Sequence, residues 1–316
     1  MRLAVTLSPF FSLLAAIALE VRLPDSPKHP PVDHPYFLYA LCIAAAALCL
    51  AGVACRFRKG FREVFRHKAA FYAATFLFFN VLNILTNKFC LLPPIFFPTP
   101  DRILSVLVED AVYLLVDCLG SSAVLLFTGF FSGAAAGLIT GIAVGFSKTV
   151  GYWVNPLIRI LGPIPPTAWI PIVLVAFPTT FAGGVFLIAL SVWFPTAVMT
   201  SSGILNVQNA YFEVSSTLGA SRCFQIFRVG IPAAMPFVFI GLFTGTCSSF
   251  ITLMTAEMVG VKNGIGWYIN WQREMLSYAN VYAGLIIIAV SFYILITLLF
   301  KLRDHVLVWQ KGVIKW

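Results

Sequence analysis

The sequence predicts an all-α polytopic membrane protein. Sixty per cent of its 316 residues are hydrophobic and ten per cent are charged, whereas about a quarter are charged in soluble domains. The apolar runs are continuous and about 20 residues long, as transmembrane helices require, and they do not alternate as barrel strands do. We expect about eight spans, near residues 3–21, 36–54, 69–87, 119–146, 153–177, 181–205, 233–256 and 280–301.

The basic residues orient these spans. With a cytoplasmic amino terminus, most of the 21 Lys and Arg residues lie inside, as the positive-inside rule demands. Both termini are then expected in the cytoplasm. The formal net charge of +9 reflects these flanking residues, so we expect contacts with anionic lipid and none with nucleic acid.

Residues 1–68 are expected to form a two-helix extension that ends in the basic segment CRFRKGFREVFRHK. Its first apolar stretch could be a signal peptide, but it lacks a clear small-x-small cleavage site and ends at Glu20-Val21-Arg22 like a membrane border. We therefore favour a retained span. The transmembrane domain proper is expected over residues 69–316.

Glycine recurs every fourth residue within the span 119–146. These residues, the glycine row, are Gly129, Gly133, Gly137, Gly141 and Gly145. Small residues at this spacing let a neighbouring helix approach closely. The row predicts a tight seam, either inside a moving bundle or in plain static packing.

Neither a cofactor nor a metal ion is expected to bind this chain. The seven cysteines include no C-x-x-C pair, which favours apolar packing. The stretch GIAVGFSKT at 141–149 differs from a phosphate-binding loop, because Ser147 precedes Lys148 where Gly is required. Any ATP hydrolysis is therefore expected in a separate subunit.

Prolines interrupt the next span in the segment GPIPPTAWIPI, at 162–172. Proline removes a backbone donor and kinks a helix, which membranes tolerate beside neighbours or a water-filled cavity. Pro165 and Pro166 are thus candidates for the translocation path. Simple kinked packing is the other interpretation.

A short polar segment, residues 206–232, separates two uncharged stretches. No Asp, Glu, Lys or Arg occurs in 160–212 or in 229–256, and Glu213, Arg222 and Arg228 lie between these two stretches. The segment must therefore lie outside the bilayer. Gly219 suits a left-handed helix stop and Ser221 suits the start of the next helix, so we expect two short helices.

Hydroxyl residues follow one another along the span 233–256. Thr244, Ser248, Thr252 and Thr255 share one face at a period near 3.6 residues. They are candidates for lining the path of a polar solute. Interhelical hydrogen bonding is an equally good interpretation.

Several of these segments resemble the permeases of bacterial ABC importers. Residues 206–232 resemble their cytoplasmic EAA loop, E-A-A-x3-G-x9-I-x-L-P, through Glu213, Gly219 and the run 229–232. Val214 and Ser215 replace the two alanines, and Val229 and Ile231 replace Ile and Leu. The segments LPPIFFPTP, GPIPPTAWIPI and AEMVGVKNGIGWYI resemble the nitrate, sulfonate and taurine branch of the family.

This resemblance implies a permease in the bacterial inner membrane whose last six spans form the core. Its partners would be cytoplasmic ABC ATPase subunits, a second permease copy and an extracytoplasmic solute-binding protein. The ATPase-coupling residues would be Glu213, Gly219, Ala220, Ser221, Arg222 and Pro232. Its solute would be a small polar molecule such as a sulfonate, taurine or nitrate.

Two other classes of protein fit the sequence less well. A secondary transporter or channel with no ATPase partner would place ionisable relays inside the membrane, whereas Asp117, Glu257 and Asp304 lie at span borders. An intramembrane enzyme would need a nucleophile, an acid-base pair or a metal motif such as H-E-x-x-H, which the sequence lacks. We therefore expect no enzymatic activity in this chain.

Overall fold

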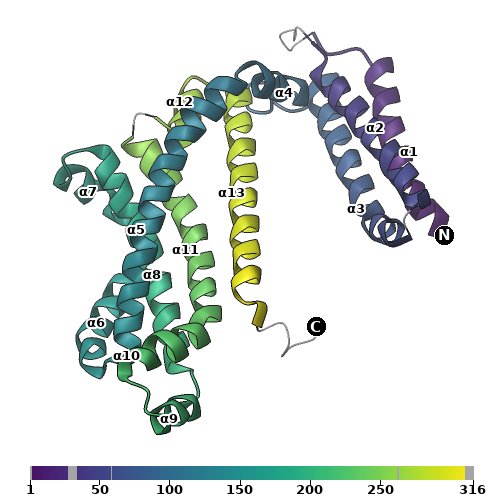
Figure 1. Ribbon diagram of the computed structural model, residues 1–316. Coiled ribbons are helices and arrows are strands. Elements are labelled where there is room, and N and C mark those ends of the chain that lie inside the picture. Colours follow the sequence, from purple (N-terminus) through teal and green to yellow (C-terminus); the bar gives the residue numbers. More distant parts are fainter. Residues whose placement is uncertain (1, 28–33, 58, 262, 310–316) are drawn as a thin grey trace. The chain divides into compact units, whose positions relative to one another are not determined.

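A computed structural model describes residues 2–27, 34–57, 59–261 and 263–309 (Figure 1). Throughout these residues the regular secondary structure is helical. The chain divides into two compact units. One comprises Met1–Val112 and Trp271–Leu285, and the other comprises Tyr113–Asn270 and Ile286–Trp316.

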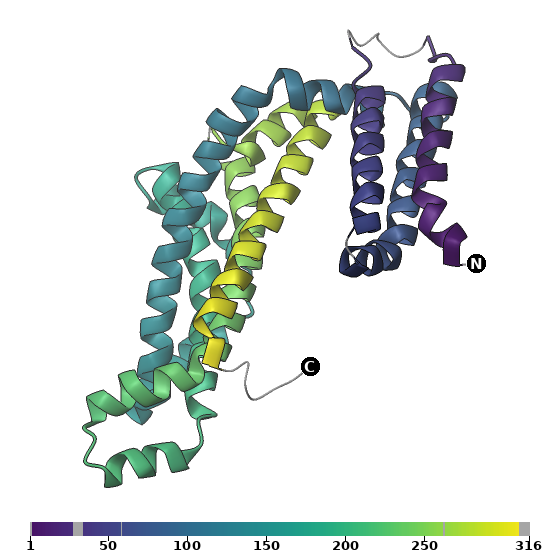
Figure 2. The same ribbon diagram turned by 45° about the vertical axis from the view of Figure 1, so that its right-hand side comes forward.

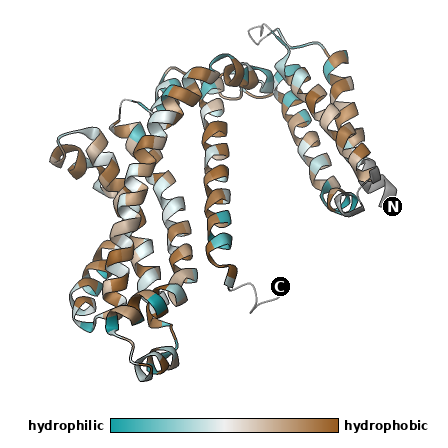
Figure 3. Ribbon diagram, in the orientation of Figure 1, coloured by the Kyte–Doolittle hydropathy of each residue, from teal (hydrophilic) through white to brown (hydrophobic). Residues whose placement is uncertain are grey.

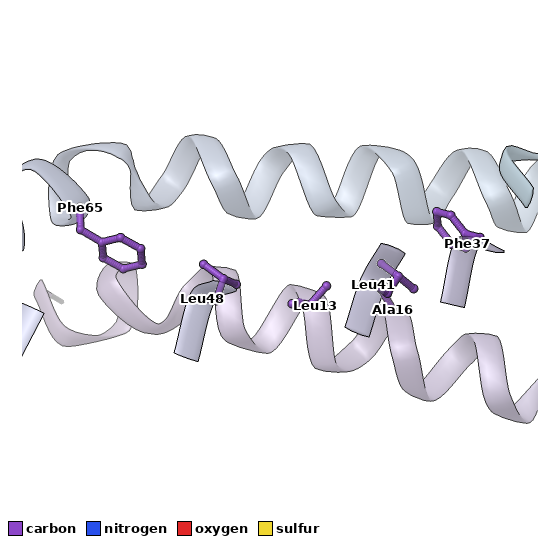
Figure 4. Close-up of a cluster of buried hydrophobic side chains, with 6 residues drawn as sticks. All are labelled: Leu13, Ala16, Phe37, Leu41, Leu48 and Phe65. Atoms are coloured by element: carbon purple, nitrogen blue, oxygen red, sulfur yellow. The ribbon is translucent and has the colours of Figure 1, made fainter. Parts of the chain in front are cut away.

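The first unit is built on three long helices. Its elements are α1 (Arg2–Arg22), α2 (Tyr36–Phe57), α3 (Lys59–Asn83), the π-helix η1 (Ile84–Lys88), α4 (Pro100–Glu109) and the beginning of α13 (Tyr278–Val306). Side chains of α1, α2 and α3 point toward one another in one apolar cluster (Figure 4), formed by Leu13, Ala16, Phe37, Leu41, Leu48 and Phe65. Because α3 runs unbroken through residue 68, the domain boundary expected there falls inside a helix.

A buried ionic network joins the end of α1 to η1. Lys88 Nζ lies 3.1 Å from Glu20 Oε1 and 2.6 Å from Asp25 Oδ1, and the Lys88 side chain is only 4% exposed. The Asn83 amide donates to Glu20 Oε2, and the Asn87 amide donates to Asp25 Oδ1. A cation buried to this extent needs such partners, because desolvation is costly.

The second unit surrounds three long apolar helices. Its elements are η2 (Tyr113–Cys118), α5 (Leu119–Phe146), α6 (Lys148–Leu161), η3 (Pro166–Trp169), α7 (Ile170–Ala176), α8 (Thr180–Leu205), α9 (Asn209–Thr217), α10 (Arg222–Phe224), η4 (Gln225–Gly230), α11 (Ile231–Val259), the start of α12 (Ile265–Glu274) and most of α13. Side chains of α5, α8 and α11 meet in a core of Leu125, Leu126, Ile188, Phe250 and Leu253.

Six helical segments of the described chain are long and apolar enough to cross a membrane. They are Tyr36–Cys55, Arg62–Lys88, Tyr113–Phe146, Thr180–Leu205, Arg222–Val259 and Tyr278–Val306, and the ribbon in Figure 3 is coloured by the hydropathy of their residues. The expected first span forms helix α1 but is not one of the six. The expected span 153–177 is broken after Leu161, and its halves bend by 85°, because Pro163, Pro165 and Pro166 interrupt the helical hydrogen bonds.

The glycine row of α5 lies against α8. A Cβ atom added at Gly137 would lie 2.7 Å from Thr196 Cβ, and one at Gly141 would lie 2.6 Å from Thr200 Cβ. A Cβ at Gly133 would collide with the backbone of Ala189. Any side chain larger than hydrogen would therefore separate the two helices.

We predict that Gly141→Leu weakens the second unit. The new side chain enters a contact that has no room for a methyl group, and overpacking costs about 1–3 kcal/mol. The midpoint of thermal unfolding in detergent should fall. Gly120→Leu is the matched control, because nothing lies within 4 Å of a Cβ at that position of α5. Equal midpoints for both variants would contradict the tight seam.

We also predict that Lys88→Ala destabilises the first unit by about 3–5 kcal/mol, because it leaves the poorly exposed Glu20 carboxylate without its cation. Removing both charges with Lys88→Ala and Glu20→Gln should restore part of the loss. Unfolding by denaturant in detergent measures the effect. Lys68→Ala, at an exposed position of α3, should change little, and an equal loss there would refute the role of the network.

Candidate functional site

The segment 206–232 forms a helical projection at one end of the second unit. α9 and the α10–η4 pair lie beyond the ends of α8 and α11 (Figure 2). We call this segment the projecting loop. Its two helical parts are separated at Gly219, where the sequence places the break.

The break is a compact turn that glycine makes possible. Gly219 has φ +79°, a left-handed conformation that side chains disfavour. Its N–H donates to Ser216 O at 3.0 Å, and the Ala220 N–H donates to Ser215 O at 3.0 Å. These paired bonds form a Schellman ending for α9, so the conformation of this glycine sets the direction in which the chain turns from α9 into α10.

The next helix begins immediately after this turn. Ser221 Oγ accepts the Phe224 N–H at 3.3 Å, which caps the first turn. The Gln225 side-chain amide donates to Ser216 Oγ at 2.7 Å and so ties η4 back to α9. Pro232 is the second residue of α11, which continues from η4 without a break.

The surface of the loop combines charge with exposed apolar groups. Glu213 and Arg222 are exposed. Leu218 is 81% exposed and Val214 is 59% exposed. The coupling residues expected from the motif do not include these two exposed apolar residues. The available signal was a pair of aliphatic residues in a segment that must lie outside the bilayer, since exposed apolar groups there suit a protein contact.

A cavity of about 690 Å³ lies behind the loop. It is lined by the ends of α5 and α8, the beginning of α6, and the loop itself, including Phe146, Ser147, Ile204, Phe212, Arg222 and Gln225. The loop therefore does not pack tightly onto the core along its whole length. It has room to shift while its ends stay attached to α8 and α11.

The residues expected along a translocation path are more scattered. Thr244 is exposed whereas Thr252 is buried. The hydroxyls of Thr244, Thr252 and Thr255 donate to the carbonyls of residues four positions earlier in α11. Their protons are thus engaged within the helix, and only their oxygens remain to accept bonds from a solute.

The other path candidates lie at the break between α6 and α7. Pro165 precedes η3 with ψ 137°, and Pro166 is the first residue of η3. Pro165 is exposed and Pro166 is half-buried. These prolines therefore form part of the bend between α6 and α7. Their contact with a solute stays a prediction.

Known membrane transport proteins are similar to this chain in sequence. Residues 133–307 match the family of binding-protein-dependent transport system inner membrane components. The chain is 29% identical to the taurine transport system permease protein TauC of Escherichia coli over an alignment of 231 residues. This alignment covers 71% of this chain and 83% of the relative. It is 31% identical to the nitrate import permease protein NrtB of Synechococcus elongatus over an alignment of 141 residues. This alignment covers 45% of this chain and 50% of the relative.

A solved structure shares the fold. A chain of the MetNI methionine ABC transporter in an inward-facing conformation superposes with a TM-score of 0.52 at 18% identity, over 63% of this chain and 98% of that one. The family match covers more than half of the sequence and includes the glycine row from Gly133 onward, the projecting loop and α11. The chain therefore belongs to the binding-protein-dependent transport system inner membrane components.

Proposed function

We propose that this inner-membrane permease of an ABC importer is driven by separate ATPase subunits that bind the projecting loop. The observation that carries the proposal is the loop's construction: a helical projection that turns at Gly219 and exposes Leu218 and Val214. The loop and both termini then lie in the cytoplasm. This side also agrees with the distribution of Lys and Arg.

The loop is suited to transmit displacement because it continues directly into α11. The apolar segment Arg222–Val259 includes η4 and the whole of α11. ATP shifts a conformational equilibrium only through its different affinity for the two states. Closure of the ATPases would move the projecting loop, and α11 would carry that movement across the membrane.

The translocation path forms between two copies of this permease in the proposed assembly, with an extracytoplasmic binding protein delivering the solute. The relatives are named as permeases for taurine and nitrate, which supports a small oxyanion as the solute. Membrane lipid surrounds the assembly. Thr244, Ser248, Thr252, Thr255, Pro165 and Pro166 remain candidates for contacts with the solute.

We predict that Gly219→Val leaves the protein inserted but abolishes transport. A β-branched residue resists a positive φ, at a cost of about 1–2 kcal/mol, so the turn from α9 to α10 changes and the two helices no longer present one surface. Gly219→Asn is the matched control, because Asn tolerates the left-handed conformation, and it should retain most uptake. Radiolabelled taurine and nitrate uptake by cells, together with the amount of membrane-inserted chain, measures the effect. Normal uptake with Gly219→Val would refute the coupling role.

We further predict that Leu218→Asp reduces co-purification of the ATPase subunits about tenfold or more, because a buried apolar contact with a partner is worth about 1.5–3 kcal/mol. Thr217→Asp, also exposed and adjacent, is the control and should co-purify nearly as the wild type does. If no nucleotide-hydrolysing protein co-purifies with the wild-type chain, a transporter or channel without an ATPase partner becomes the better interpretation.

A further inference from the structure

A carboxylate is buried at the end of α11 opposite the projecting loop. Glu257 lies in the last turn of α11 and is 1% exposed. Its Oε2 accepts the Gly266 N–H at 2.7 Å, in the first turn of α12. A negative charge is favoured at a helix N-terminus, so this contact joins two successive helices.

The turn before α12 is shaped around this carboxyl group. Gly264 has φ +120°, and a Cβ atom there would collide with the carboxyl carbon of Glu257. A Cβ at Gly266 would lie 2.9 Å from Glu257 Cβ. The Glu257 side chain can therefore lie this close to the turn only because residues 264 and 266 are glycines.

α5 supplies the third part of the contact. Ser122 Oγ accepts the Ile265 N–H at 2.9 Å, one residue before the Gly266 N–H that Glu257 accepts. We call Glu257, Ser122 and the Gly264–Gly266 turn the α11 clasp. Through it, α5, α11 and the beginning of α12 meet at a single turn.

The clasp is expensive for a purely structural joint. Glu257 Oε1 is buried and has no hydrogen-bond partner among the described residues, and burying a carboxyl group without full compensation is costly. A hydrophobic side chain at this position would leave the Gly266 N–H without its acceptor, so the joint depends on the carboxyl group. Groups retained at such a cost are frequently functional.

The position of the clasp on α11 indicates what it does. α11 has 29 residues, about 43 Å at 1.5 Å per residue. The projecting loop joins one end of this helix and Glu257 lies at the other. A displacement or rotation of α11 therefore reaches the α12 turn through the Glu257–Gly266 bond.

We propose that Glu257 is a positioning residue for transport, which couples movement of α11 to the α12 turn at the far side of the membrane. This inference rests on the proposed function, because the projecting loop supplies the movement. The Gly264–Gly266 turn is then the outer element that responds to the ATPases. Ser122 holds the same turn against α5.

The test is hydrogen exchange of the backbone amides in the full-length chain with its ATPase subunits in lipid nanodiscs, with and without MgATP. In the wild type, MgATP should change exchange both in the projecting loop and at Ile265 and Gly266. Glu257→Ala should speed exchange at Ile265 and Gly266 about tenfold, the equivalent of one lost hydrogen bond. It should also remove their response to MgATP while the loop still responds.

Two variants control for misfolding. Glu257→Gln keeps a carbonyl oxygen for the Gly266 N–H and should restore most of the MgATP response at the turn. Met258→Ala, the next residue of α11, should behave as the wild type does. Loss of the response in Met258→Ala as well would overturn the specific role of Glu257.

The exchange of the loop tests the proposed ATPase coupling, and the exchange of the turn tests the role of Glu257. A loop that does not respond to MgATP in the wild type would refute the proposed ATPase coupling. A loop that responds while the turn does not, or a Glu257→Ala turn that responds normally, would overturn the role of the clasp and leave the coupling intact.

Discussion

The seam between α5 and α8 is the constraint on which the permease core depends. In lipid, the hydrophobic effect does not press helices together, so close van der Waals contact must supply the association. The glycine row provides it by letting the backbone of α5 approach Thr196 and Thr200 of α8. Because α11 packs on the same pair through Phe250 and Leu253, the seam also sets the position of α11.

α11 is the element in which the features of the second unit converge. The projecting loop enters it through η4, Gly230 packs against Phe146 of α5 near that junction, and the Glu257 carboxyl group closes its other end. A long helix with fixed contacts at both ends moves as a body, whereas a helix attached at one end can bend or fray. This arrangement is the physical basis of the proposed coupling.

The first unit follows a different principle. Its apolar cluster is confined to the contacts of α1, α2 and α3, and a buried Lys88 with its acidic partners fixes the end of α1 to η1. These contacts satisfy a cation that burial alone would destabilise. Residues 1–68 were expected to form a separate extension. In the structure they belong to a compact unit that continues to Val112.

Much of the fold could be predicted because lipid imposes simple rules on sequence. The length of apolar runs identified the principal spans, four-residue spacing identified the row from Gly129 to Gly145, and the isolated charges of 206–232 placed that segment outside the bilayer. The Pro-rich segment indicated a broken helix, although its 85° bend was not predictable, because proline removes bonds without specifying a direction.

Sequence alone thus determined the helical class, the family resemblance and the position of the projecting loop, since hydropathy and glycine conformation are local properties. Tertiary structure alone decided which surfaces meet. It brought Glu257, Ser122 and Gly266 together from three helices, exposed Leu218, and divided the hydroxyl stripe of α11 between buried and exposed positions. These outcomes depend on contacts between residues up to 143 positions apart, which no local pattern records.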